Sequence, residues 1–233
     1  DGTDHRDAPG SPGQKGLGCP VEIEFSVNLG RGATEKPDFA FLPLRPMTAT
    51  AEMIDVDITD EEIAKSFCFS KHSLGNAVKD DLRDIIFIKP EVFDAAKTVQ
   101  IAAEIGKLNK ILLTENRRYL LIGPGRWGSA DHWLGIPVQW SDISGVGAVV
   151  ESFSEQIRAE PSQGSHFFHN ITTLGINYIN VTNNGADFVD WEWLRSRPFS
   201  NETTHAAHVC LEEPFVIKVD GKTSQSVMYA GLE

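Results

Sequence analysis

The chain has 233 residues, of which 41% are hydrophobic and 23% charged, so it can bury a core as one large domain or two small ones. Its formal net charge of −12, with Arg and Lys scattered along the chain, disfavours nucleic acid as a partner because it would repel a phosphate backbone. The sequence has no apolar run near the roughly 20 residues of a membrane span, and its three cysteines lie in no zinc-ligand spacing. We therefore expect a cytoplasmic protein without structural zinc.

The N-terminal part is expected to be a tail followed by a hairpin. Residues 1–17 are rich in Gly, Pro and Asp and predict a flexible segment. Residues 19–29 alternate apolar and polar side chains, and residues 39–47 form a second extended run, so together they predict a β-hairpin with a long loop. Pro43 lacks a backbone N–H, which predicts an edge position or a bulge there.

The rest of the chain predicts an α/β fold with a mixed sheet. The elements expected first are a short helix over 60–68, a buried strand over 84–90, a long helix over 92–114 and a strand over 119–123. The short helix would be capped by Thr59 or Asp60. Further strands are expected over 146–151, 174–181, 208–221 and 225–230, with a short helix or turn over 190–196. The strand–helix–strand unit favours two parallel strands joined by a crossover.

The stretch "GPGRWGS", residues 123–129, follows a predicted strand and should lie at its carboxyl end, where α/β sheets bind ligands. The spacing of Gly123, Gly125 and Gly128 is that of a dinucleotide-binding turn, and Glu151 would then be the acid that binds the ribose. That interpretation requires a helix after the turn. The residues up to Val146 show no helical pattern, so a dinucleotide-binding oxidoreductase is the weaker alternative.

Two other interpretations of the turn remain open. In one, the glycines allow backbone N–H groups to converge on an anion, with Arg126 and Ser129 as further donors and Asp131 orienting Arg126 or binding a metal. In the other, the glycines only avoid steric clashes, and Trp127 packs in the core.

A second polar stretch, "PSQGSHFFHN" over residues 161–170, has the composition of a pocket that binds an oxyanion. His166 is the candidate acid or base, and the candidate ligand-binding residues are Ser162, Gln163, Gly164 and Ser165. The alternative is a helix start capped by serine, with Phe167 and Phe168 in the core. His205 and His208 lie three residues apart, and we expect them to form a surface pair rather than a metal site.

The stretches "VEIEF" (21–25) and "FLPLRPM" (41–47) resemble the C-terminal end of the ATP-grasp domain in the pyruvate phosphate dikinase and phosphoenolpyruvate synthase family. The resemblance implies that Glu22 and Glu24 hold Mg²⁺ on the phosphates of ATP and that Arg45 faces the transferred phosphoryl group. Carboxylates at i and i+2 of one strand point the same way, and oxygen ligands suit magnesium. The family has glutamine where this chain has Pro43.

The resemblance also implies a domain layout and a function. Residues 1–47 would be the closing hairpin of the ATP-grasp domain, and residues 48–233 would resemble the C-terminal region of bacterial phosphoenolpyruvate synthase-like proteins. The expected function is that of the C-terminal part of an ATP-dependent phosphotransferase, or kinase, that binds phosphoenolpyruvate, pyruvate or phosphate. Its catalytic residues would be Arg45, Arg126 and His166. The N-terminal half that grips ATP is not in this sequence, so we expect no ATP turnover by the chain alone. The alternative from another class is a non-catalytic scaffold between this domain and that half.

Overall fold

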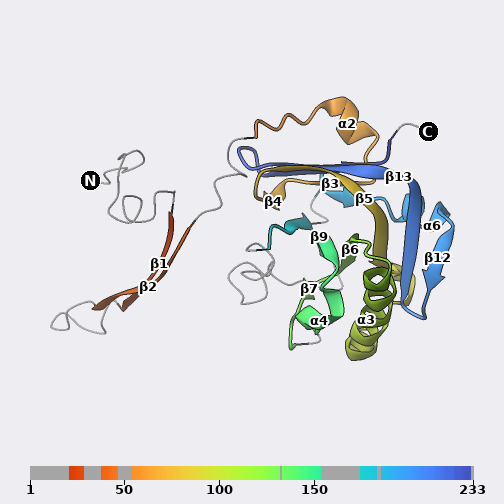
Figure 1. Ribbon diagram of the computed structural model, residues 1–233, viewed down its shortest axis with the longest axis horizontal. Helices are drawn as coiled ribbons and strands as arrows, with labels where there is room; N and C mark the ends of the chain where they lie inside the picture. Colours follow the sequence, from red (N-terminus) through yellow and green to blue (C-terminus); the bar gives the residue numbers. More distant parts are fainter. Residues whose placement is uncertain are drawn as a thin grey trace. The chain divides into compact units, whose positions relative to one another are not determined.

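The computed structural model describes residues 21–28, 38–46, 54–131, 133–153, 174–182 and 185–231. The chain divides into two compact units, Asp1–Met53 and Ile54–Glu233, which are described separately (Figure 1).

The described residues of the first unit form the predicted hairpin. Strands β1 (Val21–Asn28) and β2 (Asp38–Pro46) are antiparallel, with Glu22 opposite Arg45. The register shifts so that Leu42 and Pro43 stand opposite Glu24, which confirms the predicted bulge. The side chains of Glu22, Glu24 and Arg45 lie outside the described part of the structure. Their roles toward Mg²⁺ and ATP therefore stay predictions.

The second unit is an α/β fold with a mixed sheet, which has ten strands in the described residues. The strands of this sheet are β3 (Cys68–Ser70), β4 (His72–Leu74), β5 (Ala77–Ile88), β6 (Tyr119–Pro124), β9 (Val146–Phe153), β10 (Asn177–Thr182), β11 (Phe188–Val189), β12 (Phe199–Glu202), β13 (Ala206–Asp220) and β14 (Gln225–Tyr229). Their order is β11-β3-β14-β13-β5-β6-β9-β10-β4, with β12 on β13. The neighbours from β5 to β10 are parallel and the other pairs antiparallel, so the predicted parallel unit is confirmed.

The sheet closes on itself through the short segment that contains β3 and β4. Only Lys71 separates these two strands, yet β3 pairs with β14 and β4 pairs with β10 at the far end of the strand order. The Oγ atom of Ser70 also donates to the Asn180 carbonyl, and the Ser73 amide donates to the Ser224 carbonyl at 2.9 Å. This closure leaves one face of the sheet inside and one outside.

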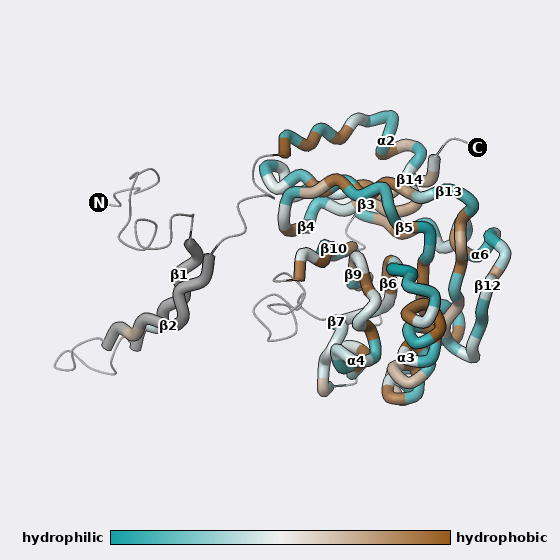
Figure 2. The backbone as a smooth tube through the Cα atoms, viewed as in Figure 1, coloured by the Kyte–Doolittle hydropathy of each residue, from teal (hydrophilic) through white to brown (hydrophobic). Residues whose placement is uncertain are grey.

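Alternate residues of the central strands supply two separate hydrophobic cores. In β5, Ile85 and Phe87 join the inner cluster with Phe215, whereas Ile86 and Ile88 join the outer cluster under helix α3 (Thr98–Thr114). All four β5 side chains are completely buried, as expected for parallel strands that are covered on both faces. Figure 2 shows brown, apolar stretches within several strands of the sheet, and α3 alternates between polar and apolar residues.

Three predicted boundaries were wrong. The short helix expected over 60–68 is α2 (Asp60–Ala64), which ends at Ala64, and β3 already begins at Cys68. Strand β5 begins at Ala77 rather than residue 84, because its charged first half pairs with the second half of β13. The long helix begins at Thr98 rather than residue 92, and the segment before it forms the 3₁₀ turns η1 (Pro90–Val92) and η2 (Ala95–Lys97). Proline favours such a start and cannot sit inside a helix.

The short helix α2 (Asp60–Ala64) has the predicted cap. The Thr59 side chain accepts from the Glu62 amide at 3.3 Å, and Glu62 accepts from the Thr59 amide at 3.0 Å. Glu62 also pairs with Lys218 of β13 at 2.6 Å and accepts from the Tyr229 hydroxyl at 2.8 Å. Glu62 thus both completes the cap of α2 and attaches the helix to the sheet.

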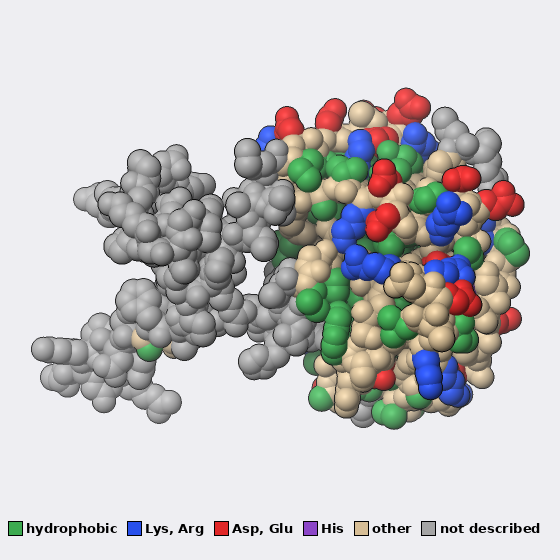
Figure 3. Space-filling view, in the orientation of Figure 1, with side chains coloured by type: hydrophobic (Ala, Val, Ile, Leu, Met, Phe, Trp, Pro, Cys, Tyr) green, Lys and Arg blue, Asp and Glu red, His purple; other side chains and the backbone are tan. Residues whose placement is uncertain are grey.

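On the face shown in Figure 3, acidic and basic side chains of the second unit alternate without a large area of one sign.

Within the described ranges, none of the helices has the length and hydropathy that a membrane crossing requires.

Candidate functional site

The carboxyl ends of β6, β9 and β10 meet at one edge of the sheet, and the glycine turn starts there. Gly123 of β6, Glu151 of β9 and Asn180 of β10 are neighbours in register. The turn then forms a parallel pair of two short strands, β7 (Arg126–Trp127) and β8 (Gly135–Ile136). Because α/β proteins bind ligands at the carboxyl ends of parallel strands, this row is the candidate site.

The conformation of the turn accounts for its glycines. Gly125 has φ +70° and Gly128 has φ +76°, in the left-handed region where side chains are strained. A Cβ on Gly135 would lie 1.9 Å from the carbonyl oxygen of Arg126, so β8 can approach β7 only without a side chain there. The chain path therefore requires glycine at these positions whether or not a ligand binds.

The backbone amides of the turn do not form the expected anion nest. The Gly125 amide donates to the Ser152 carbonyl at 2.9 Å, and the Arg126 amide donates to the Leu134 carbonyl at 2.9 Å. The Trp127 amide donates to Glu151 Oε1 at 2.9 Å, and the Gly128 amide donates to the Ile136 carbonyl at 2.8 Å. Each of these four donors is already used within the protein. These four amides are therefore not available to an anion at this edge.

Glu151 of β9 holds the turn in place through a hydrogen bond to its backbone. Its side chain is completely buried and accepts hydrogen bonds from the Trp127 amide and from the hydroxyl of Tyr178. The Trp127 indole, 1% exposed, packs against Gly123 and donates from Nε1 to the Val150 carbonyl at 3.0 Å. Trp127 is thus a core residue, as the structural interpretation of the turn required. The turn is held rigidly at the edge of the sheet.

The geometry does not support the dinucleotide interpretation. The turn is followed by β8 and the single-turn helix α4 (Trp140–Ile143), not by a helix that could face a pyrophosphate. Glu151 is buried beneath Trp127 rather than presented to a ribose.

Asn180 adds a polar group that the sequence analysis missed. It is completely buried, and its Nδ2 donates weakly to the His72 carbonyl at 3.4 Å. Its Oδ1 has no hydrogen-bond partner among the residues that the structure describes. A buried acceptor without a donor costs about 1–3 kcal/mol, so such atoms mark places where a further donor is expected. The alternation of Tyr178 and Asn180 along β10 is the sequence signal that could have indicated this polar outer face.

The other predicted residues of the turn have local roles. Arg126 is partly exposed on β7. The Ser129 hydroxyl donates to the Asp131 carbonyl at 3.0 Å, and Asp131 Oδ1 accepts from the Trp133 amide at 2.9 Å. Asp131 thus stabilises the loop between β7 and β8.

The predicted pocket residues Ser162, Gln163, Gly164, Ser165 and His166 lie outside the described residues. They belong to the segment between β9 and β10, which starts directly after Phe153 at the carboxyl end of β9. Their convergence with Arg126 stays a prediction.

The histidines His205 and His208 are buried, 2% and 1% exposed, so the predicted surface pair was wrong. The Nδ1 atom of His205 lies 3.0 Å from Glu104 Oε1 of α3, whereas the Nε2 atom of His208 lies 2.7 Å from Asp84 Oδ1 of β5. Each ring has its own carboxylate, because His205 lies in the bend before β13 and His208 lies within the strand. Among the described residues, no three His, Cys, Asp or Glu side chains are placed to hold a metal ion.

The Glu104 cluster predicts a pH dependence of stability. Burial alone would raise the pKa of Glu104, but hydrogen bonds from Thr203, His205 and Gln100 lower it from 4.5 to about 2. A depressed pKa in the folded state stabilises the protein above pH 4.5 and loses that effect as the pH falls toward 2. Between pH 6 and pH 3 the wild type should lose about 2 kcal/mol more than Glu104→Gln in urea unfolding. The exposed Glu61→Gln variant is the control, and an equal loss in all three proteins would contradict the prediction.

Comparison with protein-family models, with curated proteins and with solved structures finds no match to this chain.

Proposed function

We propose that the second unit binds a small anion at the carboxyl edge of β6, β9 and β10, as part of an ATP-dependent phosphotransferase that resembles phosphoenolpyruvate synthase. The observation that carries the proposal is the buried Glu151, which fixes the turn bearing Arg126 and is the register neighbour of Asn180, whose side-chain oxygen Oδ1 is buried. Rigid placement of a binding side chain reduces the entropy that is lost when a ligand binds.

Arg126 supplies the charge that such a ligand needs. A guanidinium binds carboxylate and phosphate through two parallel hydrogen bonds, and in a molecule with net charge −12 an anion must be held by local donors. The acceptor on Asn180 favours a ligand that also carries a hydroxyl or another donor. Phosphate and phosphate esters in their monoprotonated forms meet both requirements.

The remaining parts of the proposal come from the resemblance. His166 would act as acid or base on the bound ligand, with Ser162, Gln163 and Ser165 as donors. Arg45 would face the transferred phosphoryl group, Glu22 and Glu24 would hold Mg²⁺ on ATP, and the N-terminal ATP-grasp half would be the partner. A cytoplasmic location, where ATP and such substrates occur, belongs to the same proposal.

One structural observation favours the alternative, a scaffold without catalytic activity. The four amides that the sequence analysis assigned to an anion are used within the protein, so the turn already has a structural role. In that case the exposed part of the turn would form an interface and bind no small ligand.

Calorimetric titration of the whole chain with phosphoenolpyruvate, pyruvate, phosphate and MgATP distinguishes the anion-binding proposal from the scaffold. The proposal expects at least one small anion to bind and Arg126→Ala to weaken it about 10- to 100-fold, the effect of losing a charge-assisted hydrogen bond. The matched control is Arg195→Ala, which removes an exposed arginine whose ion-pair partner among the described residues is Glu91, at 3.3 Å. Absence of binding by all four compounds, or equal affinity in Arg126→Ala, would favour the scaffold. A fluorescence change on addition of NADH would instead support the oxidoreductase.

A further inference from the structure

Strand β13 has a gap in its pairing along one side. On that side β12 pairs with it as far as Val209, and β14 pairs with it from Val216 onward. Between these positions no strand of the described residues lies beside it, and the register against β5 on the other side also breaks, from Cys210 to Phe215. Both β12 and β14 are antiparallel to β13, so they run in the same direction at the two ends of the gap. A strand edge without a partner offers backbone groups with which another chain can pair.

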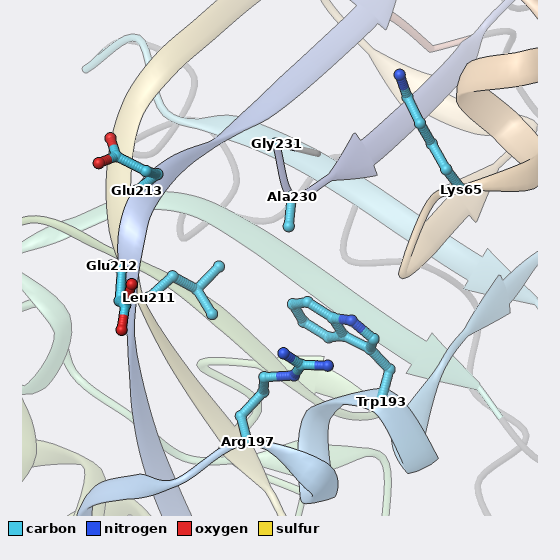
Figure 4. Close-up of a pocket in the computed structure, with 8 residues that line it drawn as sticks. All are labelled: Lys65, Trp193, Arg197, Leu211, Glu212, Glu213, Ala230 and Gly231. Atoms are coloured by element: carbon cyan, nitrogen blue, oxygen red, sulfur yellow. The ribbon is translucent and has the colours of Figure 1, made fainter. Parts of the chain in front are cut away.

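A cavity of about 570 Å³ lies at this gap. It is bordered by α2, by helix α6 (Trp191–Ser196), by β13 and by the residues after β14. The side chains of Trp193, Leu211 and Ala230 project into it from different walls (Figure 4). Trp193 and Leu211 pack against the inner core cluster, and the Trp193 ring stacks on Phe67 with centroids 4.6 Å apart. The gap therefore opens toward the inner core, and a segment that filled it would cover apolar side chains.

The backbone of β13 faces this gap at two residues. The Glu212 carbonyl accepts from Arg83 Nη1 of β5 at 2.7 Å, so it points toward β5. Because neighbouring residues of a strand direct their N–H and C=O groups to opposite sides, those of Leu211 and Glu213 point toward the gap. Pro214 alternates in the same way as Glu212, so its missing N–H removes no donor from the gap.

Two carboxylates give the gap a negative charge. Glu212 and Glu213 are exposed and line the cavity, and the described residues supply neither with an ion-pair partner. Lys65 lies across the cavity from Glu213, with its Nζ 4.6 Å from the centroid of the Tyr229 ring (Figure 4). Basic side chains on a segment beside β13 would therefore be attracted to these carboxylates, and acidic ones would be repelled.

We propose that the gap binds an extended segment of a partner protein, which adds a strand between β14 and β12. The segment alternates apolar and basic residues. Its apolar side chains pack on Leu211 and Trp193, and its basic side chains pair with Glu212 and Glu213. The proposal assigns no ligand to Arg197, which lies over the Trp193 ring at 4.8 Å. It shares no residue with the candidate site on β6, β9 and β10, so it stands independently of the proposed function.

The test is calorimetric titration of the whole chain with three acetylated and amidated pentapeptides. They are Lys-Val-Lys-Leu-Lys, its charge-reversed form Glu-Val-Glu-Leu-Glu, and a form of the first that is N-methylated at its backbone amides. We expect the basic peptide to bind and the acidic one not to bind. The N-methylated form should bind about tenfold more weakly or less, because it cannot donate hydrogen bonds to β13. On binding, hydrogen exchange measured by NMR should slow at the amides of Leu211 and Glu213 but not at that of Glu212.

A double variant locates the binding on β13. Glu212→Gln combined with Glu213→Gln removes both charges without changing the core, and should weaken binding of the basic peptide about 3- to 10-fold. The matched control combines Asp80→Asn with Asp81→Asn, an exposed acidic pair on β5, and should keep the full affinity. Thermal denaturation shows whether each variant is folded.

No binding of the basic peptide, equal binding of the acidic or N-methylated form, or equal losses in the two double variants would each overturn the proposal. So would a dimer of the free chain that the peptide dissociates, because a second copy would then cover the edge. Arg126→Ala should leave peptide binding unchanged, which distinguishes this result from failure of the phosphotransferase proposal.

Discussion

Replacing Glu151 by alanine should lower the free energy of unfolding by about 3–5 kcal/mol. The substitution removes the acceptor of the Trp127 amide and of the Tyr178 hydroxyl and leaves a cavity at a completely buried position. Buried donors that lose their partner cost more than the hydrogen bond contributed, because water cannot replace it. With a typical total stability of about 5–15 kcal/mol, the loss would be a large fraction of the whole.

Urea denaturation followed by circular dichroism measures this loss. Glu151→Gln should cost less, because it keeps one acceptor oxygen and nearly the same volume. Glu213→Ala, an exposed strand glutamate, is the matched control and should change stability by no more than about 0.5 kcal/mol. If Glu151→Ala behaved like the control, Glu151 would not be what holds the glycine turn.

Replacing Gly123 by alanine should cost about 2–3 kcal/mol through overpacking. The new Cβ would lie 2.4 Å from Cζ2 of Trp127 and 3.2 Å from Cγ1 of Ile88. The indole cannot move away cheaply, because it is buried and its Nε1 is bonded to the Val150 carbonyl. Gly231→Ala, where a Cβ meets no atom of the described residues within 4 Å, should be close to neutral and serves as the control.

A double-mutant cycle identifies the cause of this loss. In a Trp127→Leu background the clash disappears, so Gly123→Ala should cost at least about 1 kcal/mol less than in the wild type. Trp127→Leu by itself destabilises the protein, which the cycle subtracts. A Gly123→Ala variant of unchanged stability but reduced affinity for a small anion would reverse the interpretation and return Gly123 to the ligand site.

The candidate site was located from the sequence but not explained by it. The glycine turn lies at the carboxyl end of a parallel strand as predicted, since a strand followed by glycines is a local pattern. The amides of the turn, however, donate hydrogen bonds to acceptors on Glu151, Ser152, Leu134 and Ile136, which lie up to 27 residues away along the chain. Which acceptor an amide meets depends on how β8 and β9 pack, and composition does not encode that.

The two histidines show the same limit. His205 and His208 were expected to form a surface pair, because their spacing of three residues suits a metal site on a helix but Cys210 adds no ligand at a useful spacing. Each is buried because a carboxylate from a distant element, Glu104 or Asp84, satisfies its ring. A polar side chain can be buried at little cost only when such a partner is present, so its burial depends on a tertiary contact.

By itself, the sequence determined the features that depend on neighbours along the chain. These are the hairpin with its bulge at Pro43, the cap of α2 by Thr59, the body of α3 and the parallel strands on either side of it. Only the tertiary structure decided how the segment 68–74 closes the sheet, where the turn amides bind, and that β13 leaves a cavity beside Leu211. The reason is physical: caps, periodicity and proline act within a few residues, whereas closure, burial and cavities arise from contacts between segments that the chain order does not specify.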